Sequence, residues 1–489
     1  MGTINAAFSI IAGALDADQS GLSIIAGNVA NANTPGYARE TPTWRELSPV
    51  TISGRTFGTG AAETGAQSIR DRVLLERLDQ QQQMASASGT RLTGLNLLQS
   101  LFTPASGSAG STAGNIGSDI TSFFDSFSSL EANPSDNALR QQVLSSARML
   151  AGDISNTAAS VNAQQASLDQ EAAGVASQVN ALTTSIAQLN RQIQSLSPNQ
   201  DAGTLEDQRQ QDLSKLSQLV GINQVTTENN GLTITTTSGQ VLVSEGVSTD
   251  MTTGTVNGVT HFYIGGTDAT SGLMTGGGEL GGYLTVRDQD IPQTMAALDA
   301  LAFGISTEVN AQNAAGIDLN GNAGANIFAQ SAQVAGSAAS ISVGMTDPSQ
   351  IASAGAGQGS GDNSNAIALA NLATQSDPPI LNGLTLPDGT VLAAGQTLLN
   401  GQTPSGYYSG FVTALGSTVS QVQTENTAEN ASVEQLQTQN NALSQVNLND
   451  EASAMTTLER SYQAASQVFA MLNTIMSSAL NLGVQTAVS

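Results

Sequence analysis

Apolar residues recur at alternating spacings of four and three along both ends of this chain. Near the N-terminus the pattern comprises Ile4, Phe8, Ile11, Leu15, Asp18, Leu22, Ile25 and Val29. Near the C-terminus it comprises Met455, Leu458, Tyr462, Ala465, Phe469, Leu472, Met476 and Ala479. This spacing puts each set on one side of a helix and is typical of helices that pair along an apolar seam. The similar lengths of the two patterns predict that the terminal helices pair with each other.

The longest unbroken heptad pattern lies inside the chain, from Val161 to Leu196, and predicts a helical hairpin or a coiled coil. Its helix is expected to start at Ser135 or Asp136, after the break at Asn133-Pro134, and to end before Pro198. The N-terminal helix should end before Asn33, because Pro35 and Gly36 suit the centre of a type II turn. Further helices are expected at 69–102, around 120–127 and at 204–220, with a Gly/Ser/Ala linker at 103–117.

Composition changes after this helical region. Residues 222–286 are rich in Thr, Val and Gly, and alternate between apolar and polar positions. The dipeptides Asn230-Gly231, Ser238-Gly239 and Asn257-Gly258 favour hairpin turns, so this range predicts a β-rich insertion. Residues 40–66 are expected to be extended or loop-like. Residues 316–408 predict a second insertion, with short possible strands at 341–343 and 384–386.

The expected fold class is mainly α with inserted β: paired terminal coiled-coil helices, a helical bundle and central β-rich insertions. Residues 1–66 and 446–489 are expected to form a terminal helical domain. The bundle comprises 67–221, 287–315 and 409–445, and its insertions are 222–286 and 316–408. A chain of 489 residues is too long for one ordinary core, which agrees with several domains.

Charge narrows the possible partners. The formal charge is −25, from 14 basic and 39 acidic residues, so neither nucleic acid nor an anionic membrane is an expected partner. No apolar run is long enough to cross a membrane, and Asp16 and Asp18 interrupt the first apolar stretch, which therefore does not predict a cleaved signal peptide. The absence of cysteine excludes disulfides, thiolate metal sites and a cysteine nucleophile.

Motifs that could support catalysis are weak. Gly276–Gly281 satisfies G-x-G-x-x-G, but a poor strand candidate precedes it and no βαβ alternation surrounds it, so a flexible turn is the better interpretation. Asp318–Asn322 resembles the start of a calcium loop but has Ala323 and Ala329 where a glycine and an acidic ligand are needed. His261 is the only histidine and cannot anchor a zinc site alone. We therefore expect no catalytic residue, cofactor or metal.

The terminal seams are the most informative feature. A lone pair of helices buries little surface, so residues such as Ile25, Phe469 and Met476 should remain partly exposed unless neighbouring subunits cover them. The apolar members of both seams, without Ala465 and Ala479, are the candidate assembly interface. An ordinary intramolecular coiled coil is the alternative, and it is preferred for 161–196.

Several segments carry a family resemblance. Asn28–Arg39 resembles the N-terminal signature shared by flagellar rod, hook and hook-associated proteins. Other segments resemble the hook-associated protein 1 family: Glu279–Asp288, Asn310–Asn313, Gly316–Asn322, Gly361–Ala366, Val446–Ala452 and Leu458–Ala465. The resemblance weakens in 40–66, 222–275 and 325–405. It implies a non-enzymatic structural subunit of the flagellum that joins the hook to the filament.

The same resemblance implies the location of such a protein and its partners. It implies type III export without a cleaved signal, an extracellular location and a ring of identical subunits. The implied partners are the hook protein, a second junction protein leading to the flagellin filament, and an export chaperone at the C-terminal helix. The terminal helices are expected to form an inner tube, with the insertions outermost.

Three alternatives remain. A hook or distal-rod protein shares the N-terminal signature but should be mainly β and carry an A-I-x-G-x-G-F-F motif, which this sequence lacks. An extracellular coiled-coil adhesin would explain the acidity and the heptads but not the matched seams at both ends. An enzyme displayed on the flagellar surface is the most remote alternative.

Overall fold

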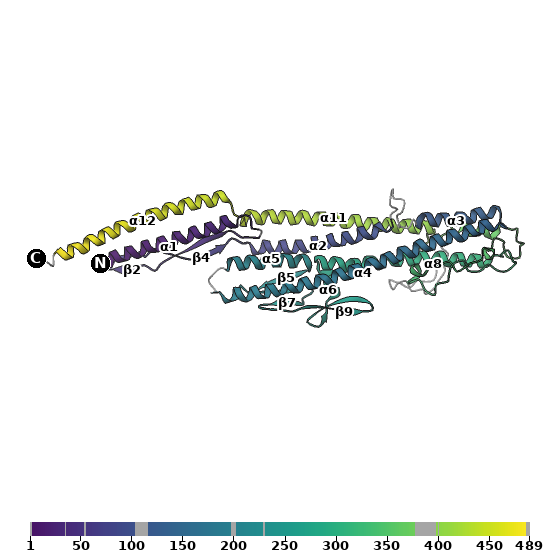
Figure 1. Cartoon of the computed structure of the whole chain (residues 1–489), viewed down its shortest axis with the longest axis horizontal. Helices are drawn as coiled ribbons and strands as arrows, with labels where there is room; N and C mark the ends of the chain where they lie inside the picture. Colours follow the sequence, from purple (N-terminus) through teal and green to yellow (C-terminus); the bar gives the residue numbers. More distant parts are fainter. Residues whose placement is uncertain are drawn as a thin grey trace.

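The computed structural model describes residues 2–34, 36–52, 55–102, 116–196, 202–227, 230–376, 398–399 and 401–485. The molecule is long and narrow, with both terminal helices at one end and a helical bundle extending away from them (Figure 1). Helices dominate, and two small antiparallel sheets lie on one side of the bundle. The expected mainly α fold with inserted β is confirmed.

The terminal domain is built from both chain ends. Helix α1 (Gly2–Asn31) lies beside α12 (Leu448–Gln485), as the matched heptads predict. Strand β1 (Glu40–Glu46) pairs antiparallel with β4 (Ala61–Ser68), and the connection between them contains a second hairpin, β2 (Val50–Ile52) with β3 (Arg55–Phe57). The chain after α1 turns as expected: Tyr37 N donates to Thr34 O over 3.2 Å, and Gly36 has a φ of +76°. Pro35 lies outside the described residues.

The bundle contains six long helices: α2 (Arg72–Ser100), α3 (Ile116–Ala132), α4 (Asn137–Ser195), α5 (Gly203–Leu219), α8 (Ile291–Ala315) and α11 (Pro404–Ser444). Helix α4 has 59 residues and is therefore about 90 Å long. It begins where the sequence predicts, because the Asp136 carboxylate accepts hydrogen bonds from the backbone N–H groups of Ala138 and Leu139. Residues 103–115 of the predicted linker lie outside the described residues.

The main core lies between α3, α4 and α8. Phe123 and Phe127 are fully buried, their ring centroids are 5.3 Å apart, and Phe328 adds a third ring 5.5 Å from Phe123. Arg140 of α4 is also fully buried and satisfies its guanidinium with the backbone carbonyls of Pro134 and Ile351. This buried donor holds the chain around Ile351 against the start of α4.

The first insertion forms two antiparallel sheets. The four-stranded sheet contains β5 (Ile222–Thr226), β6 (Leu232–Thr236), β7 (Val241–Ser244) and β8 (Val247–Ser248) in sequence order. The other contains β9 (Met251–Val256), β10 (Val259–Ile264) and β11 (Thr267–Asp268). Asn230, Gly239 and Asn257 have positive φ, as the hairpin dipeptides predict. The sheets bury apolar side chains against the second half of α4, whose predicted heptad face is largely buried there.

The predicted β-rich range of 222–286 is too long at its C-terminal end. The strands end at Asp268, and the chain continues as α6 (Thr270–Gly276), α7 (Gly278–Thr285) and a π-helical turn, η2 (Val286–Asp290). Leu280 and Leu284 are fully buried, and this spacing of four places them on one helical face. The glycine motif therefore joins two helices: Gly277 has a φ of +97°, and α6 rather than a strand precedes it.

The second insertion has little regular structure among its described residues. It contains α9 (Ser337–Ser340), a 3₁₀ turn η3 (Pro348–Gln350) and α10 (Ser364–Asn371). The strand expected at 341–343 is reduced to one bridge between Val343 and Phe328, and the strand expected at 384–386 lies outside the described residues. Helix α11 starts at Pro404, before the predicted boundary at 409, with the Thr403 hydroxyl as its N-cap.

Candidate functional site

The two terminal seams face each other. The rings of Phe8 and Phe469 meet edge to face, with centroids 5.3 Å apart. A Cβ on Gly21 would lie 2.9 Å from Leu458 Cδ1, so the helices approach closely at this point. Most remaining members of the predicted interface are half-buried: Ile11, Leu15, Leu22, Met455, Leu472 and Met476. Val29 and Tyr462 are exposed, and the side chain of Ile4 is outside the described set.

One expectation about this seam is wrong. Ile25 was expected to stay partly exposed in a lone subunit, but it is only 4% exposed. Helix α1 packs against β1 and β4 of its own chain as well as against α12, and this third layer was not foreseen from the heptads. Trp44 of β1 belongs to it, with its ring 3.6 Å from a Cβ built on Gly21.

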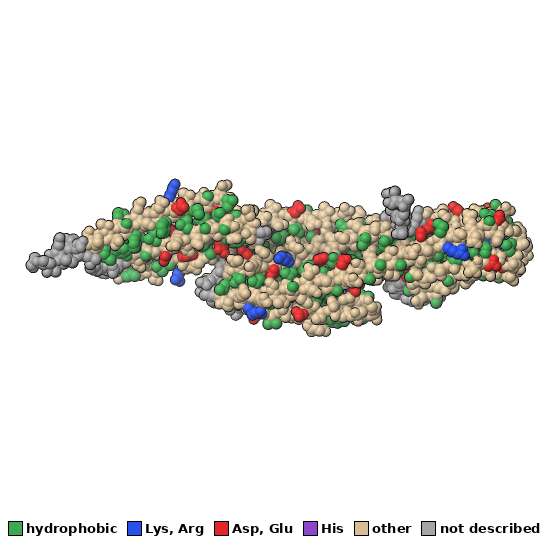
Figure 2. Space-filling model, in the orientation of Figure 1, with side chains coloured by type: hydrophobic (Ala, Val, Ile, Leu, Met, Phe, Trp, Pro, Cys, Tyr) green, Lys and Arg blue, Asp and Glu red, His purple; other side chains and the backbone are tan. Residues whose placement is uncertain are grey.

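A second apolar row on α12 remains uncovered. Val468, Met471 and Ile475 are 39%, 57% and 53% exposed, and we call these three residues the outer stripe. They recur at spacings of three and four, directly beside seam positions 469, 472 and 476. Figure 2 shows hydrophobic side chains gathered over the terminal helices. The spacing of these three residues is a signal present in the sequence. The heptad seam predicted above includes only two positions per heptad and therefore does not contain them.

A polar cluster closes the inner end of the terminal domain. It consists of Asn28, Tyr37, Arg39, Glu40 and Glu451, and we call it the junction cluster. The Asn28 amide donates to Glu40 O over 2.8 Å and to Glu451 Oε2 over 3.1 Å. Its carbonyl accepts from Glu40 N over 2.9 Å and from the Tyr37 hydroxyl over 3.0 Å. Asn28 is 1% exposed, so these bonds satisfy an otherwise costly buried amide.

An ion pair completes the junction cluster. Arg39 Nε lies 2.6 Å from Glu451 Oε1, and the Glu451 side chain is 1% exposed. Burial, followed by the negative charges of Glu40, Asp207 and Glu451, raises the pKa of Tyr37 to about 12. Tyr37 therefore stays neutral and keeps the proton that it donates to Asn28. The cluster joins two of the segments that carry the family resemblance, across 423 positions of sequence.

A neighbouring clamp fixes the terminal domain to the bundle. Arg70, which follows β4, contacts Glu206 Oε2 and Asp207 Oδ1 of α5, each over 2.7 Å. Asp207 also accepts a hydrogen bond from Ala38 N over 3.4 Å. All three side chains are largely buried. These contacts hold the two parts of the chain in position.

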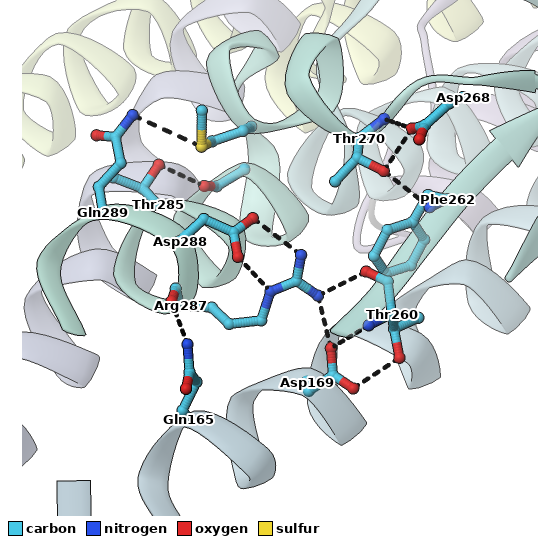
Figure 3. Close-up of polar contacts among 12 residues, drawn as sticks. Gln165, Asp169, Thr260, Phe262, Asp268, Thr270, Thr285, Arg287, Asp288 and Gln289 are labelled. Carbon is cyan, nitrogen blue, oxygen red and sulfur yellow. Dashed lines mark hydrogen bonds and ion pairs between the residues drawn. The ribbon is translucent and has the colours of Figure 1, made fainter. Parts of the chain in front are cut away.

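The resemblance segment Glu279–Asp288 has a structural role of the same kind. Arg287 is 1% exposed and binds Asp288 through two bonds of 2.8 and 2.9 Å (Figure 3). It also contacts Asp169 of α4 over 2.6 Å and the backbone carbonyl of Thr260 in β10 over 2.9 Å. This arginine ties the π-helical turn to α4 and to the smaller sheet.

The residues considered for catalysis are placed in structural roles. Asp318 Oδ1 accepts from the backbone N–H groups of Asn320 and Asn322, each over 2.8 Å, which is a side-chain-stabilised turn. His261 Nδ1 lies 2.7 Å from Asp268 Oδ2. Hydrogen bonds from Thr270, then from His261, lower the pKa of Asp268 to about 2. Within the described ranges, no three His, Asp or Glu side chains converge as metal ligands, and no helix has the length and apolarity to cross a membrane.

Comparison with known proteins adds independent evidence. Residues 107–328 match the family model described as the flagellar hook-associated protein FlgK helical domain, and residues 10–37 match the flagella basal body rod protein model. The flagellar hook-associated protein 1 of Escherichia coli is 25% identical, over 96% of this chain and 98% of that protein. That of Bacillus subtilis is 24% identical, over 96% of both chains. The chain is therefore similar to flagellar hook-associated protein 1 over nearly all of its length.

A solved structure of a hook junction protein has a similar fold. The flagellar hook junction protein FlgK from Burkholderia pseudomallei matches with a TM-score of 0.62 and 19% identity. The match covers 76% of this chain and all of that one, and at this identity it shows a common fold. The rod-protein match contains Asn28 and Tyr37, and the helical-domain match contains Arg287. The resemblance found in the sequence segments is therefore confirmed, and those segments contain Asn28, Tyr37 and Glu451 of the junction cluster and the buried Arg287.

Proposed function

We propose that this chain is a structural subunit of the bacterial flagellum that joins the hook to the filament. Similarity to flagellar hook-associated protein 1 over nearly the whole chain and the uncovered outer stripe support this proposal. Three apolar side chains on one face of α12 lie beside a seam that the chain covers only in part. An exposed apolar face of this kind marks a site of contact with other proteins, here other subunits. The outer stripe is the observation that carries the proposal.

The proposed partners follow from the family. They are further copies of this chain arranged in a ring, the hook protein, and a second junction protein that leads to the flagellin filament. An export chaperone would bind α12 before type III export without a cleaved signal, and the assembled protein would be extracellular. The proposed assembly interface contains the exposed and half-buried seam residues together with the outer stripe.

We also propose that the protein is not an enzyme. The polar clusters described above are closed by their own ion pairs and hydrogen bonds, and their geometry positions domains. The exposed apolar face supports a role that depends on contact surfaces rather than on chemistry.

The test uses a matched pair of methionines. Met471 in the outer stripe is 57% exposed, and Met149 on α4 is 60% exposed. Met471→Asp should abolish filament attachment, because burying an ionised carboxylate in an apolar contact costs several kcal/mol even after the surroundings relax. Its melting curve should match wild type, since the side chain is already solvated in the single subunit. Met149→Asp should leave swimming unchanged.

The readouts are swimming, filaments seen by electron microscopy, and flagellin in the culture medium. The expected result for Met471→Asp is secreted flagellin without filaments, while the variant itself is also found outside the cell. Normal filaments in this variant would contradict the proposed interface. Retention of the variant inside the cell would instead place the defect at export. Met471 is preferred to Leu472, because Leu472 is half-buried and its substitution would disturb packing within the subunit.

A further inference from the structure

A groove in the bundle lies between α2, α4, α5 and α7. Figure 1 shows α2, α4 and α5 in the bundle, away from the end of the molecule that α12 occupies. The volume of the groove is about 520 Å³. Gly89, Thr90 and Gly94 of α2 form one wall, and the apolar side chains of Leu97, Leu168 and Leu219 line the groove. Leu97 is 57% exposed. The groove therefore has apolar walls that nothing among the described residues covers.

Two carboxylates meet at this groove without a cation. The Tyr283 hydroxyl donates to Glu279 Oε1 over 2.9 Å. The pKa of Tyr283 is raised by burial, then by Glu279, and further by the charge of Glu171 on α4. Both carboxylates therefore act on the same hydroxyl. No Arg, Lys or His lines the groove, and no ion pair among the described residues involves Glu171 or Glu279.

A buried acceptor provides a second, independent observation. Gln164 lines the groove and is 7% exposed. Its Nε2 donates to Gly94 O over 2.8 Å, which fixes the orientation of the amide. Its Oε1 has no hydrogen-bond partner among the described residues. Buried acceptors are almost always paired, so this atom indicates that a donor belongs in the groove.

We propose that the groove binds an arginine side chain presented by a protein partner. A guanidinium has five N–H donors in one plane, enough for both carboxylates and for Gln164 Oε1. Its methylene stem matches the leucine side chains, which would not suit a hydrated metal ion. A lysine ammonium is a compact point charge and matches two separated carboxylates less well. This proposal stands apart from the junction function, since the outer stripe lies on another domain.

Methyl NMR of the full chain tests the proposal directly. Leucine methyl groups are labelled, so that Leu97, Leu168 and Leu219 report from the groove. The probe is the blocked tripeptide Ac-Gly-Arg-Gly-NH₂, and the matched control peptide has glutamine in place of arginine. We expect saturable shifts of these three methyl signals with the arginine peptide only. Absence of shifts, or equal shifts with the glutamine peptide, would overturn the proposal.

Variants then assign the contacts. Glu279→Gln and Glu171→Gln should each weaken binding about tenfold, the loss expected for a charge-assisted hydrogen bond. Gln164→Leu should also weaken binding. Glu434→Gln, on the exposed surface of α11, should bind as wild type. Unchanged affinity in all three groove variants would refute the site. Groove signals that shift with protein concentration alone, and stop shifting in Glu279→Gln, would identify a second copy as the source of the arginine.

Discussion

Two pairs of phenylalanines show how the bundle differs from the terminal domain. Phe123 and Phe127 in the bundle, and Phe8 and Phe469 between the terminal helices, have the same centroid separation of 5.3 Å and the same edge-to-face geometry. The bundle pair is fully buried, whereas Phe469 is 37% exposed. The two ring pairs thus make the same kind of contact, but only the bundle pair is fully enclosed by protein.

The difference teaches that the two regions are completed in different ways. The bundle core is enclosed by its own helices and by residues of the second insertion, so its aromatic contacts also gain from full burial. The terminal helices touch along one seam and leave a second apolar row in water. Their stability in a single subunit should therefore be lower than that of the bundle, and should increase when neighbours cover them.

The largest expected effect comes from truncating the two pairs. Phe123→Ala should lower the free energy of unfolding by about 3–5 kcal/mol, because it leaves a cavity in a closed core. Phe469→Ala should cost about 1 kcal/mol or less, because water already reaches the ring. Urea unfolding followed by circular dichroism measures both. Equal losses would break the comparison and show that the terminal helices are as firmly packed as the core.

The next effect concerns the junction cluster. Arg39→Gln leaves Glu451 buried without its cation and should cost about 2–3 kcal/mol, less than a fully buried pair because Arg39 is 28% exposed. The loss should appear as faster amide hydrogen exchange in α1 and α12, with α3 and α4 unchanged. Arg77→Gln is the control, because Arg77 of α2 is exposed and forms no ion pair with the described residues. Faster exchange throughout the bundle would show that the two regions unfold together.

The next expected effect is a pH dependence of the stability of the bundle, caused by two buried aspartates. Burial, then a hydrogen bond and charge from Asp153, raises the pKa of Asp119 to about 7, and burial raises that of Asp79 to about 6. The folded bundle thus holds protons that the unfolded chain releases near pH 4. These groups stabilise the fold fully below about pH 4, and that contribution is lost as the pH rises through about 6 to 7.

Asp119→Asn should remove part of this loss. We expect it to raise the free energy of unfolding at pH 8 by about 2 kcal/mol and to leave it nearly unchanged at pH 4. Chemical unfolding at both pH values measures the difference, and Asp125→Asn on the exposed side of α3 serves as the control. A variant that is equally affected at both pH values would contradict the assignment of the proton to Asp119.

The smallest effect compares two helix caps. The Asp136 carboxylate caps α4, and the Asn447 side chain accepts a hydrogen bond of 3.0 Å from Asn449 N at the start of α12. Replacing either by alanine should cost about 1 kcal/mol. Asp136→Ala should shift the main unfolding transition, whereas Asn447→Ala should only speed exchange within α12. If both variants shifted the main unfolding transition, this would show that the two regions unfold as one cooperative unit.

The sequence predicts the helical parts of this fold well and the contacts between distant parts poorly. Heptads, Asn-Gly turns and the Pro134 break are local signals, and each corresponds to an element in the structure. The β-rich range was extended to 286 because Thr and Gly are frequent there, whereas Leu280 and Leu284 bury one helical face. In this stretch the helical periodicity of the leucines, and not the Thr and Gly content, corresponds to the structure.

The functional surfaces show the same limit. Phe8 and Phe469 were placed on the correct seams because a heptad is a property of one helix. The burial of Ile25 depends on a third layer, and no local pattern reports it. The junction cluster depends on side chains at opposite ends of the chain, so only their presence in two resemblance segments hinted at it. The proposed assembly interface remains a prediction.

The contact between Asn28 and Glu451 spans 423 positions, and this has a consequence for the order of folding. A ribosome releases the N-terminus first, so α1 emerges long before α12 exists. The insertions and the bundle helices before α11 can close over shorter distances while synthesis continues, whereas α11 meets α2 across 341 positions. Throughout that time the seam of α1 has no partner in its own chain. The helix that is synthesised last, α12, therefore completes the packing of the helix that is synthesised first, α1. We expect the terminal domain to be the last part of the protein to fold.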